Sequence, residues 1–206
     1  MTHRLILASK SPARLQALRS AGLEPEVVVS GVDDDGVTDD RPDLLARSLA
    51  VAKGTAVLER VEGDVILVAC DSVLEFEGRP YGKPATADEA VAHWRRIRGG
   101  QGVLHTGHFV VVRSGADEVA QAMIASTVVR FADLTNEEID AYVATGEPLV
   151  VAGGFTLDGY GGAFVTGVEG DPHNVIGISL PLLRQMLLDL GVGWQSLWRP
   201  GLRARV

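Results

Sequence analysis

The sequence has a single cysteine, Cys70, and aromatic residues make up only 5% of its 206 residues. One cysteine excludes an intrachain disulfide, so nothing in the sequence implies an oxidising compartment. The low aromatic content argues against the stacking platforms of many RNA-binding proteins. Charged residues or glycines interrupt every apolar stretch, so no run reaches the roughly 18 to 20 residues of a membrane-spanning helix. We therefore expect a cytoplasmic protein with no membrane partner.

Acidic residues outnumber basic ones, with 27 Asp and Glu against 19 Lys and Arg and a formal net charge of −8. This balance disfavours non-specific binding to a phosphate backbone, so we expect no nucleic-acid partner. A local basic cluster can still hold one phosphorylated small molecule. The hydrophobic fraction of 46% is ample for a packed core and indicates a globular protein.

Strand and helix signals alternate along the first part of the chain. Residues 5–8 have the pattern of a short strand, and Ser11 follows as a helix N-cap with a proline after it. Residues 42–61 carry an apolar stripe at helical spacing. The members of that stripe are Leu45, Leu49, Ala52 and Ala56. The apolar run 65–70 predicts a buried strand.

Further signals of both kinds follow. Two Thr-x-x-Glu capping boxes, beginning at Thr86 and Thr135, predict helix starts. Segments 103–113 and 119–131 are rich in β-forming residues and predict a hairpin, because a short polar turn separates them. Ser179 opens a last amphipathic helix.

The mixture of βα units with an antiparallel hairpin predicts an α/β fold, in which helices flank a mixed sheet. No composition break, linker or repeat divides residues 1–206, so we expect a single domain, in one or two lobes. Residues 191–206 are predicted to form a basic C-terminal extension. Ligands of such sheets bind where loops leave the strands, so we expect the functional residues in these loops.

The loop "ASKSPAR", residues 8–14, connects a predicted strand to a helix N-terminus. Unpaired backbone N–H groups point out of such a terminus and favour an anion. Ser9 and Ser11 can donate hydrogen bonds to phosphate oxygens, while Lys10 and Arg14 supply positive charge. The alternative is a plain Ser-Pro helix cap with solvated basic side chains.

Asp71 directly follows the apolar run of the predicted buried strand, and Lys83 lies on a nearby loop. The loop is not a P-loop, because three residues instead of four separate Gly78 from Gly82, and Pro84 follows the lysine. An acid and a lysine so placed suit phosphoryl or nucleotidyl transfer, in which the carboxylate deprotonates water or binds a divalent metal. Equally, Asp71 can simply accept backbone hydrogen bonds in a turn.

Two further features are compatible with phosphate or metal binding. Lys53 lies at the border of the apolar helical stripe, where its ammonium can turn toward a cleft or remain at the surface. The loop "SGVDDDGVTDD" holds five aspartates, and Mg²⁺ is usually held by one or two carboxylates together with substrate phosphates. One residue of Asp33–Asp35 is a candidate ligand, and the others are expected to be solvated.

The segment "AGGFTLDGYGGAFV" is rich in glycine but fails the dinucleotide pattern G-x-G-x-x-G, because Phe164 stands where the third glycine belongs. Dense glycine instead permits tight turns or a close approach of backbone to a flat ligand, and Asp158 offers acceptors to a base or sugar.

The histidines and the cysteine point away from zinc and thiol chemistry. His105 and His108 are three residues apart, so on a strand they face opposite sides. Cys70 lies in an apolar run, where cysteine is usually a small buried hydrophobe.

Taken together, these motifs and their order resemble the Maf-type nucleoside triphosphate pyrophosphatases, from about Arg4 to Leu190. The segments that carry the resemblance are "LILASKSPARLQAL", "GVDDD", "LAVAKG", "ACDSV", "GKP", "TGH", "EEIDAYVATGEP", "AGGFTLDGYGGAFV" and "GDPHNVIGISLPLL". The resemblance implies a Maf/ITPase-like α/β fold with a central cleft, commonly dimeric. It also implies hydrolysis of nucleoside triphosphates to monophosphate and pyrophosphate with a divalent metal, and an association with inhibition of septum formation.

Carried over by position, the resemblance implies a role for several residues. Asp71 is similar to the family's proton acceptor, and Asp34, with Asp71, to the carboxylates that bind Mg²⁺ or Mn²⁺. The remaining candidates form the phosphate-binding set, to which the loop geometry adds Ser11. This set is Ser9, Ser11, Arg14, Lys53 and Lys83.

Four positions depart from the family pattern, three of them at substrate-specificity positions. Ala13 stands where the better-defined branches have Arg or Trp. Ser72 stands where the branch acting on dTTP and UTP has Thr. Asp158 stands where that branch has Gln and the 7-methyl-GTP branch has Glu. Gly102 replaces a family histidine. The sequence therefore leaves base and sugar preference open.

Three functions remain as hypotheses. The first is a metal-dependent nucleoside triphosphate pyrophosphatase, whose substrates are standard, non-standard or modified nucleotides. The second is a nucleotide-binding regulator of cell division without significant turnover, and the third is an RNA-binding protein. An acid among phosphate-binding groups favours the enzyme, because a pure binding module has no evident use for Asp71. The enzyme is expected to be a homodimer.

Overall fold

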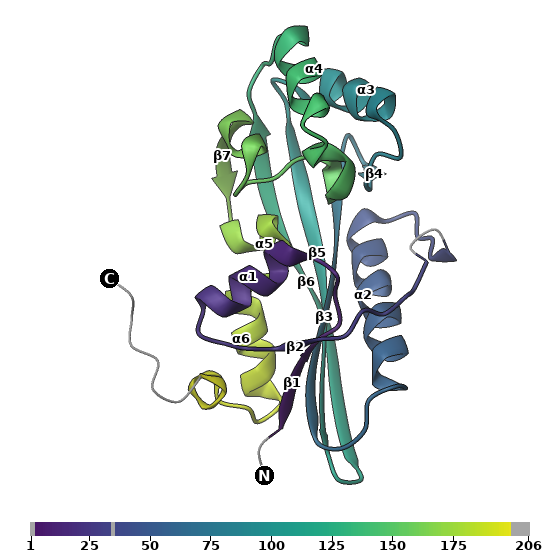
Figure 1. Ribbon diagram of the computed structural model, residues 1–206, viewed down its shortest axis with the longest axis vertical. Coiled ribbons are helices and arrows are strands. Elements are labelled where there is room, and N and C mark those ends of the chain that lie inside the picture. The colour runs from purple at the N-terminus through teal and green to yellow at the C-terminus, as the bar shows by residue number, and fades with distance from the viewer. Residues whose placement is uncertain (1–2, 34–35, 199–206) are drawn as a thin grey trace.

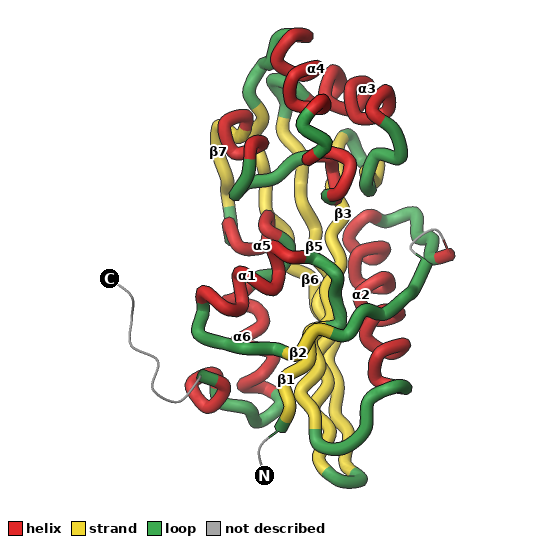
Figure 2. The backbone as a smooth tube through the Cα atoms, viewed as in Figure 1, coloured by secondary structure: helices red, strands yellow, loops and turns green. Residues whose placement is uncertain are grey.

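The computed structural model describes residues 3–33 and 36–198. One seven-stranded sheet runs along the molecule in the order β2-β1-β3-β5-β6-β7, with β4 pairing with β3 (Figure 1; Figure 2). β1 is parallel to β2 and β3, and the other pairs are antiparallel, so the predicted mixed sheet is confirmed. The strands are β1 (Arg4–Leu7), β2 (Glu26–Val27), β3 (Val65–Phe76), β4 (Arg79–Tyr81), β5 (Gln101–Ser114), β6 (Asp117–Phe131) and β7 (Val165–Glu169).

Helices flank this sheet in three places. In Figure 1, α1, α5 and α6 lie on one side of it, α2 lies on the other side, and α3 and α4 pack together at the end opposite the N-terminus. The glycine-rich segment forms short 3₁₀ turns beside α3 and α4. The helices are α1 (Pro12–Ser20), α2 (Pro42–Leu58), α3 (Ala87–Ile97), α4 (Asn136–Ala144), α5 (Pro172–Ile176) and α6 (Leu180–Asp189), and the 3₁₀ helices are η2 (Glu147–Val150), η3 (Ala152–Gly154), η4 (Tyr160–Phe164) and η5 (Trp194–Leu197).

The predicted helix starts are confirmed by their capping bonds. The side chain of Ser11 accepts from the N–H of Arg14, and Ser179 caps α6 in the same way. Thr135 and Glu138 form a complete capping box at α4. The predicted hairpin is also confirmed, by the pairing of β5 with β6.

β3 is longer than the predicted strand and changes the position of Asp71. The strand continues through Asp71 to Phe76, so the carboxylate lies within the strand instead of at its end. One edge of β3 is paired with β1 as far as Val68 and with β4 from Leu74 onwards. Residues 69–73 therefore lie between these two partner strands, and it is the end of β1 that opens this part of the sheet.

Two glycines allow α2 to lie close against the sheet. A Cβ at Gly107 of β5 would overlap the carbonyl of Ala46, and a Cβ at Gly54 would overlap the ring of Phe109. The predicted apolar stripe of α2 is only partly right, because Leu49 is buried while Leu45, Ala52 and Ala56 are half-buried. The face against the sheet is instead formed by Ala46, Leu49, Ala50, Gly54 and Val57.

The start of the predicted C-terminal extension packs on the protein. η5 lies beside α6, and the partly buried Trp194 and Leu197 contact the apolar cluster between α1, α6 and the sheet. Residues 199–206 of that extension lie outside the described residues. Within the described chain, no helix is both long and apolar enough to cross a membrane.

Candidate active site

A cavity of about 440 Å³ lies where β1 ends beside β3. All of the sequence-predicted site residues that the structure describes line it. They are Ser9, Ser11, Ala13, Arg14, Lys53, Asp71, Ser72, Lys83 and Asp158. Asp34 lies outside the described residues, although Val29–Val32, shortly before it in the chain, form part of the wall. The structure therefore brings together residues from most of the length of the chain.

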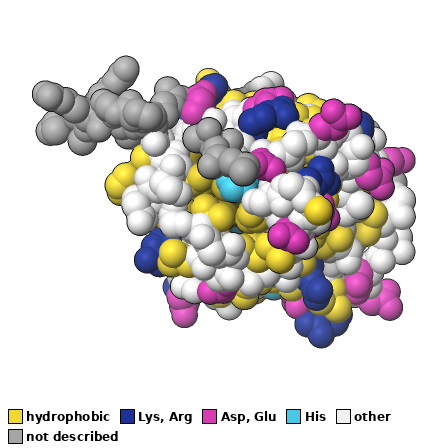
Figure 3. Space-filling view, turned by 90° about the horizontal axis from the view of Figure 1, so that it is seen from below, with side chains coloured by type: hydrophobic (Ala, Val, Ile, Leu, Met, Phe, Trp, Pro, Cys, Tyr) yellow, Lys and Arg dark blue, Asp and Glu magenta, His cyan; other side chains and the backbone are white. Residues whose placement is uncertain are grey.

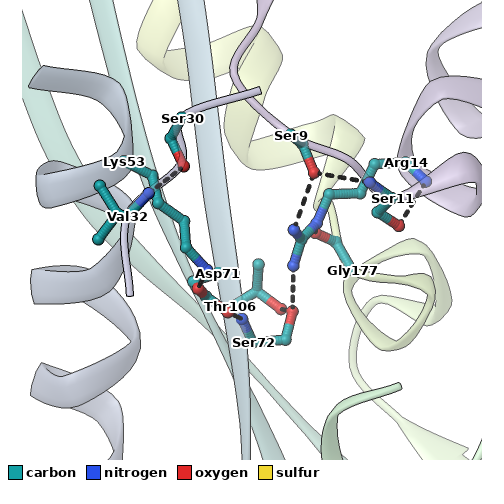
Figure 4. Close-up of polar contacts among 10 residues, drawn as sticks. All are labelled: Ser9, Ser11, Arg14, Ser30, Val32, Lys53, Asp71, Ser72, Thr106 and Gly177. Atoms are coloured by element: carbon teal, nitrogen blue, oxygen red, sulfur yellow. Dashed lines mark hydrogen bonds and ion pairs between the residues drawn. The ribbon is translucent and has the colours of Figure 1, made fainter. Parts of the chain in front are cut away.

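Asp71 and Ser72 face opposite sides of the sheet, because successive side chains alternate along a strand. Asp71 turns toward α2, where its Oδ2 atom pairs with the ammonium of Lys53 (Figure 4). The Lys53 and Asp71 side chains are only 15% and 12% exposed. The other carboxylate oxygen, Oδ1, accepts from the N–H of Ser72 at 2.7 Å. Each carboxylate oxygen of Asp71 therefore has a partner that fixes its orientation in the cavity wall.

Arg14 reaches the same region from the opposite side of the sheet (Figure 4). Its Nε donates to the carbonyl of Gly177 at 2.7 Å, Nη1 donates to Ser9 Oγ at 3.2 Å, and Nη2 donates to Ser72 Oγ at 3.1 Å. Three acceptors on three segments hold the guanidinium in one orientation. A planar, fixed guanidinium is suited to binding phosphate oxygens.

The loop before α1 forms the predicted helix cap and lies in the cavity wall. Ser11 Oγ accepts the N-cap bond from Arg14 N–H, and Ser9 Oγ accepts from Ser11 N–H at 3.1 Å. Each hydroxyl retains its own hydrogen for donation. The loop is therefore a helix cap that also presents donors to the cavity, together with the positive end of the α1 dipole.

A chain of buried hydrogen bonds supports Ser72, and it was not predicted from the sequence. Ser72 Oγ hydrogen bonds with Thr106 Oγ1 at 2.9 Å, and Thr106 Oγ1 donates to the carbonyl of Asn174 at 3.2 Å. The side-chain amide of Asn174 donates to Leu104 O and to Thr127 Oγ1. The "TGH" and "GDPHN" segments carry these residues, but only the pairing of the strands and the docking of α5 bring them together.

The carboxylate of Glu147 organises the glycine-rich wall of the cavity, a role that the sequence reading also missed. It accepts from Tyr142 Oη at 2.8 Å, Thr156 Oγ1 at 2.6 Å, and the N–H groups of Tyr160 and Gly161 at 3.0 and 2.9 Å. Burial raises the pKa of Glu147, but these four hydrogen bonds outweigh it and hold the pKa below its ordinary value.

Cys70 and the two strand histidines take no part in the cavity wall. Cys70 is buried, and burial raises the pKa of its thiol to about 12, which disfavours the nucleophilic thiolate. His105 hydrogen bonds with Ser126 and Glu75, whereas His108 accepts from the N–H of Ser179. Both histidines lie in β5, three residues apart. Because side chains alternate along a strand, they face opposite sides of the sheet, as predicted.

The donor set of the cavity fits a hard divalent cation held chiefly by substrate. No cluster of three or more His, Cys, Asp or Glu side chains that could hold a metal occurs among the described residues. Asp71, however, offers carboxylate oxygens beside basic groups, and Mg²⁺ commonly takes only one or two carboxylates plus phosphate oxygens.

Comparisons with known proteins identify the family of this chain. A family model for Maf-like proteins matches residues 4–190. The chain is 55% identical over 204 residues to a nucleoside triphosphate pyrophosphatase of Cutibacterium acnes, with 96% of each chain covered. It is 54% identical over 198 residues to a protein of the same name from Streptomyces coelicolor, covering 96% of this chain and 95% of that one.

A solved structure, the Staphylococcus aureus Ham1 protein, is similar at a TM-score of 0.44 and 10% identity over 94% of this chain and 93% of that one, which is too distant to bear on function. The match of the Maf-like model, by contrast, runs from Arg4 to Leu190 and covers every described residue that lines the cavity. The chain therefore belongs to the Maf-like protein family.

Proposed function

We propose that this protein hydrolyses nucleoside triphosphates to the monophosphate and pyrophosphate, with Asp71 as the proton acceptor. The observation that carries the proposal is the position of Asp71, which lies between Lys53 and the Ser72–Arg14 pair in the cavity. Membership of the Maf-like family and relatives named nucleoside triphosphate pyrophosphatases support the same reaction.

The roles of the other residues follow from their charges and contacts. Arg14, Lys53 and Lys83 bind phosphate oxygens, and Ser9 and Ser11 donate hydrogen bonds to them. Asp71 takes a proton from a water molecule, whose oxygen bonds to the α-phosphorus. The bond between the α-phosphorus and the bridging oxygen breaks, and pyrophosphate leaves with the electron pair.

The proposal includes Mg²⁺ or Mn²⁺ held by Asp71, Asp34 and the phosphates of the substrate. Such an ion neutralises phosphate charge in the transition state. Lys53 keeps the Asp71 carboxylate oriented toward the cavity, since the pair spans the space between α2 and β3.

The protein is further proposed to act in the cytoplasm as a homodimer, with a nucleotide as its partner and neither nucleic acid nor membrane. On the face that Figure 3 shows, Lys and Arg side chains are interspersed with Asp and Glu, which does not favour a long polyanion. Light scattering of the purified protein tests whether it is a dimer. An RNA titration at several salt concentrations tests whether it binds nucleic acid.

The deciding experiment is a pyrophosphate-release screen over standard and modified nucleoside triphosphates with Mg²⁺ or Mn²⁺. We expect turnover of at least one nucleotide, stoichiometric monophosphate, and loss of activity when EDTA removes the metal. Nucleotide binding without pyrophosphate release from any compound would contradict the enzyme and favour a regulator that binds nucleotide without turnover.

A further inference from the structure

His108 is completely buried in β5 and uses both ring nitrogens in buried hydrogen bonds. Nδ1 donates to the carbonyl of Thr106 at 3.0 Å, and Nε2 accepts from the N–H of Ser179 at 2.8 Å. His108 is not among the described residues that line the catalytic cavity. Its contact with Ser179 nevertheless connects it to the site, because Ser179 lies two residues after Gly177, the acceptor of Arg14 Nε.

The short connection between α5 and α6 is held at two points. The carbonyl of Gly177 accepts from Arg14 Nε at 2.7 Å, and the N–H of Ser179 donates to His108. Only Ile178 separates these two groups, and its side chain is completely buried in the apolar cluster between α1, α6 and the sheet. A segment this short leaves little freedom between its ends, so a displacement of Ser179 also displaces the Gly177 carbonyl.

Of the three acceptors that orient Arg14, only the Gly177 carbonyl belongs to the backbone (Figure 4). The other two are the hydroxyls of Ser9 and Ser72, at 3.2 and 3.1 Å, and a hydroxyl can rotate. Gly177 has a φ of +116°, and a Cβ there would lie 3.1 Å from Arg14 Nε, so glycine suits this close contact. The direction of Nε therefore depends chiefly on where the connection holds this carbonyl.

Loss of the acceptor at His108 would release the connection. Ser179 is only 3% exposed, so water cannot readily replace the ring nitrogen as the partner of its N–H. A buried N–H without an acceptor is unfavourable, so the connection is expected to move until this donor finds a new partner. The Gly177 carbonyl then moves with it, and Arg14 loses its fixed orientation.

We propose that His108 is a positioning residue for Arg14, which it holds in a phosphate-binding orientation through Ser179 and Gly177. This inference rests on the proposed function, in which Arg14 binds phosphate oxygens of the nucleotide. Because His108 does not line the cavity, its effect on turnover passes through Arg14.

A double-mutant cycle tests whether His108 acts through Arg14. His108→Leu removes the acceptor and keeps the site filled with an apolar side chain, and it is made both in the unmodified protein and in Arg14→Ala. His108→Gln keeps an acceptor and a donor and serves as the rescue variant. His105→Leu is the matched control, since His105 lies in the same strand, is 7% exposed and also hydrogen bonds through both ring nitrogens, but faces the opposite side of the sheet.

With Arg14 present, His108→Leu is expected to lower kcat/KM for pyrophosphate release by about 10-fold or more, the scale of a misplaced substrate-binding group. In Arg14→Ala, the same change should lower kcat/KM by less than about twofold, because no guanidinium is left to misplace. His108→Gln is expected to stay within about twofold of the unmodified protein. His105→Leu should have the same effect, whatever its size, with and without Arg14.

The affinity for inorganic tripolyphosphate, measured by calorimetry, repeats the cycle without turnover. The expected pattern is the same, with weaker binding in His108→Leu only when Arg14 is present. Denaturant unfolding shows whether each variant is folded at the assay temperature, and His108→Met replaces His108→Leu if the latter unfolds.

Three outcomes overturn the inference. These are an equal loss from His108→Leu with and without Arg14, no loss from it at all, or the same loss from His108→Gln as from His108→Leu. Failure of the proposed function looks different, because the unmodified protein would then release pyrophosphate from no nucleotide, while tripolyphosphate binding would still report on Arg14.

Discussion

Asp71 and Ser72 are adjacent in β3 yet serve opposite faces of the sheet. Asp71 pairs with Lys53 on α2, and Ser72 accepts from Arg14 on α1, so two consecutive residues join the helices on both sides of the cavity. The strand alternates its side chains, and the end of β1 leaves this stretch accessible at the sheet edge. The site is therefore built around one short segment of one strand.

Replacing the carboxylate of Asp71 tests its role as the base. Asp71→Asn keeps the size of the side chain but cannot accept a proton, so turnover is expected to fall by roughly 100-fold or more. Pyrophosphate release measures turnover, and nucleotide binding by calorimetry is expected to persist. Near-normal turnover would remove Asp71 from the mechanism.

Thr106→Val tests the polar chain behind Ser72. The change keeps the shape of the side chain but removes its bonds to Ser72 and to the Asn174 carbonyl, so stability is expected to fall by about 1–3 kcal/mol and kcat/KM to fall as well. Thr166→Val is the control on β7, where the lost bond is to the carbonyl of Arg130, outside this polar chain. We expect the control to lose stability but to retain kcat/KM. Equal kcat/KM in both variants would show that Thr106 only supports the fold.

Glu147→Gln tests how the glycine-rich wall is held. The amide has one acceptor oxygen where the carboxylate has two, so at least one of the bonds to Thr156, Tyr160 and Gly161 is lost. The wall is expected to loosen, raising KM severalfold and changing the preference among bases more than kcat. Glu169→Gln, at an exposed ion pair with Arg130, is the control. A change in kcat alone would contradict a positioning role.

Gly107→Ala tests the close approach of α2. The added methyl group overlaps the Ala46 carbonyl, so α2 must move away from the sheet, at a cost of about 1–3 kcal/mol. Because α2 carries Lys53, turnover should fall with stability. Gly36→Ala meets no atom within 4 Å and is expected to change neither quantity. Denaturant unfolding and pyrophosphate release measure the two effects.

His108 predicts how stability depends on pH. Burial lowers the pKa of His108 from 6.5 to about 4. The hydrogen bond that the His108 ring donates to the Thr106 carbonyl opposes this shift but is the smaller effect. Between these values the unfolded chain binds a proton that the folded chain does not, so this histidine destabilises the fold as pH falls from about 6.5 toward 4. The full loss is on the order of 3 kcal/mol.

Denaturant unfolding across this pH range measures the effect. His108→Gln can still donate to Thr106 and accept from Ser179, but it does not titrate, so the slope of stability against pH should flatten. His3→Gln, at the exposed contact with Ser114, serves as the control and should keep the slope. An unchanged slope in His108→Gln would contradict the assignment.

Local signals in the sequence predicted the helix starts correctly because their physics is local. A capping hydroxyl accepts from an N–H two or three residues later, as at Ser11 and Thr135, so the bond is readable from spacing alone. The length of β3 was not readable in this way. Asp71 and Glu75 interrupt its apolar pattern, yet pairing with β5 carries the strand past both.

The sequence by itself determined the alternation of strands and helices, the family resemblance and the chemical identity of the site residues. Only the tertiary structure decided how these residues are oriented. The bonds from Arg14 to Gly177, from Thr106 to Asn174 and from Lys53 to Asp71 join segments that lie far apart in the chain. No local pattern encodes such contacts, because they form only when the helices dock on the two faces of one sheet.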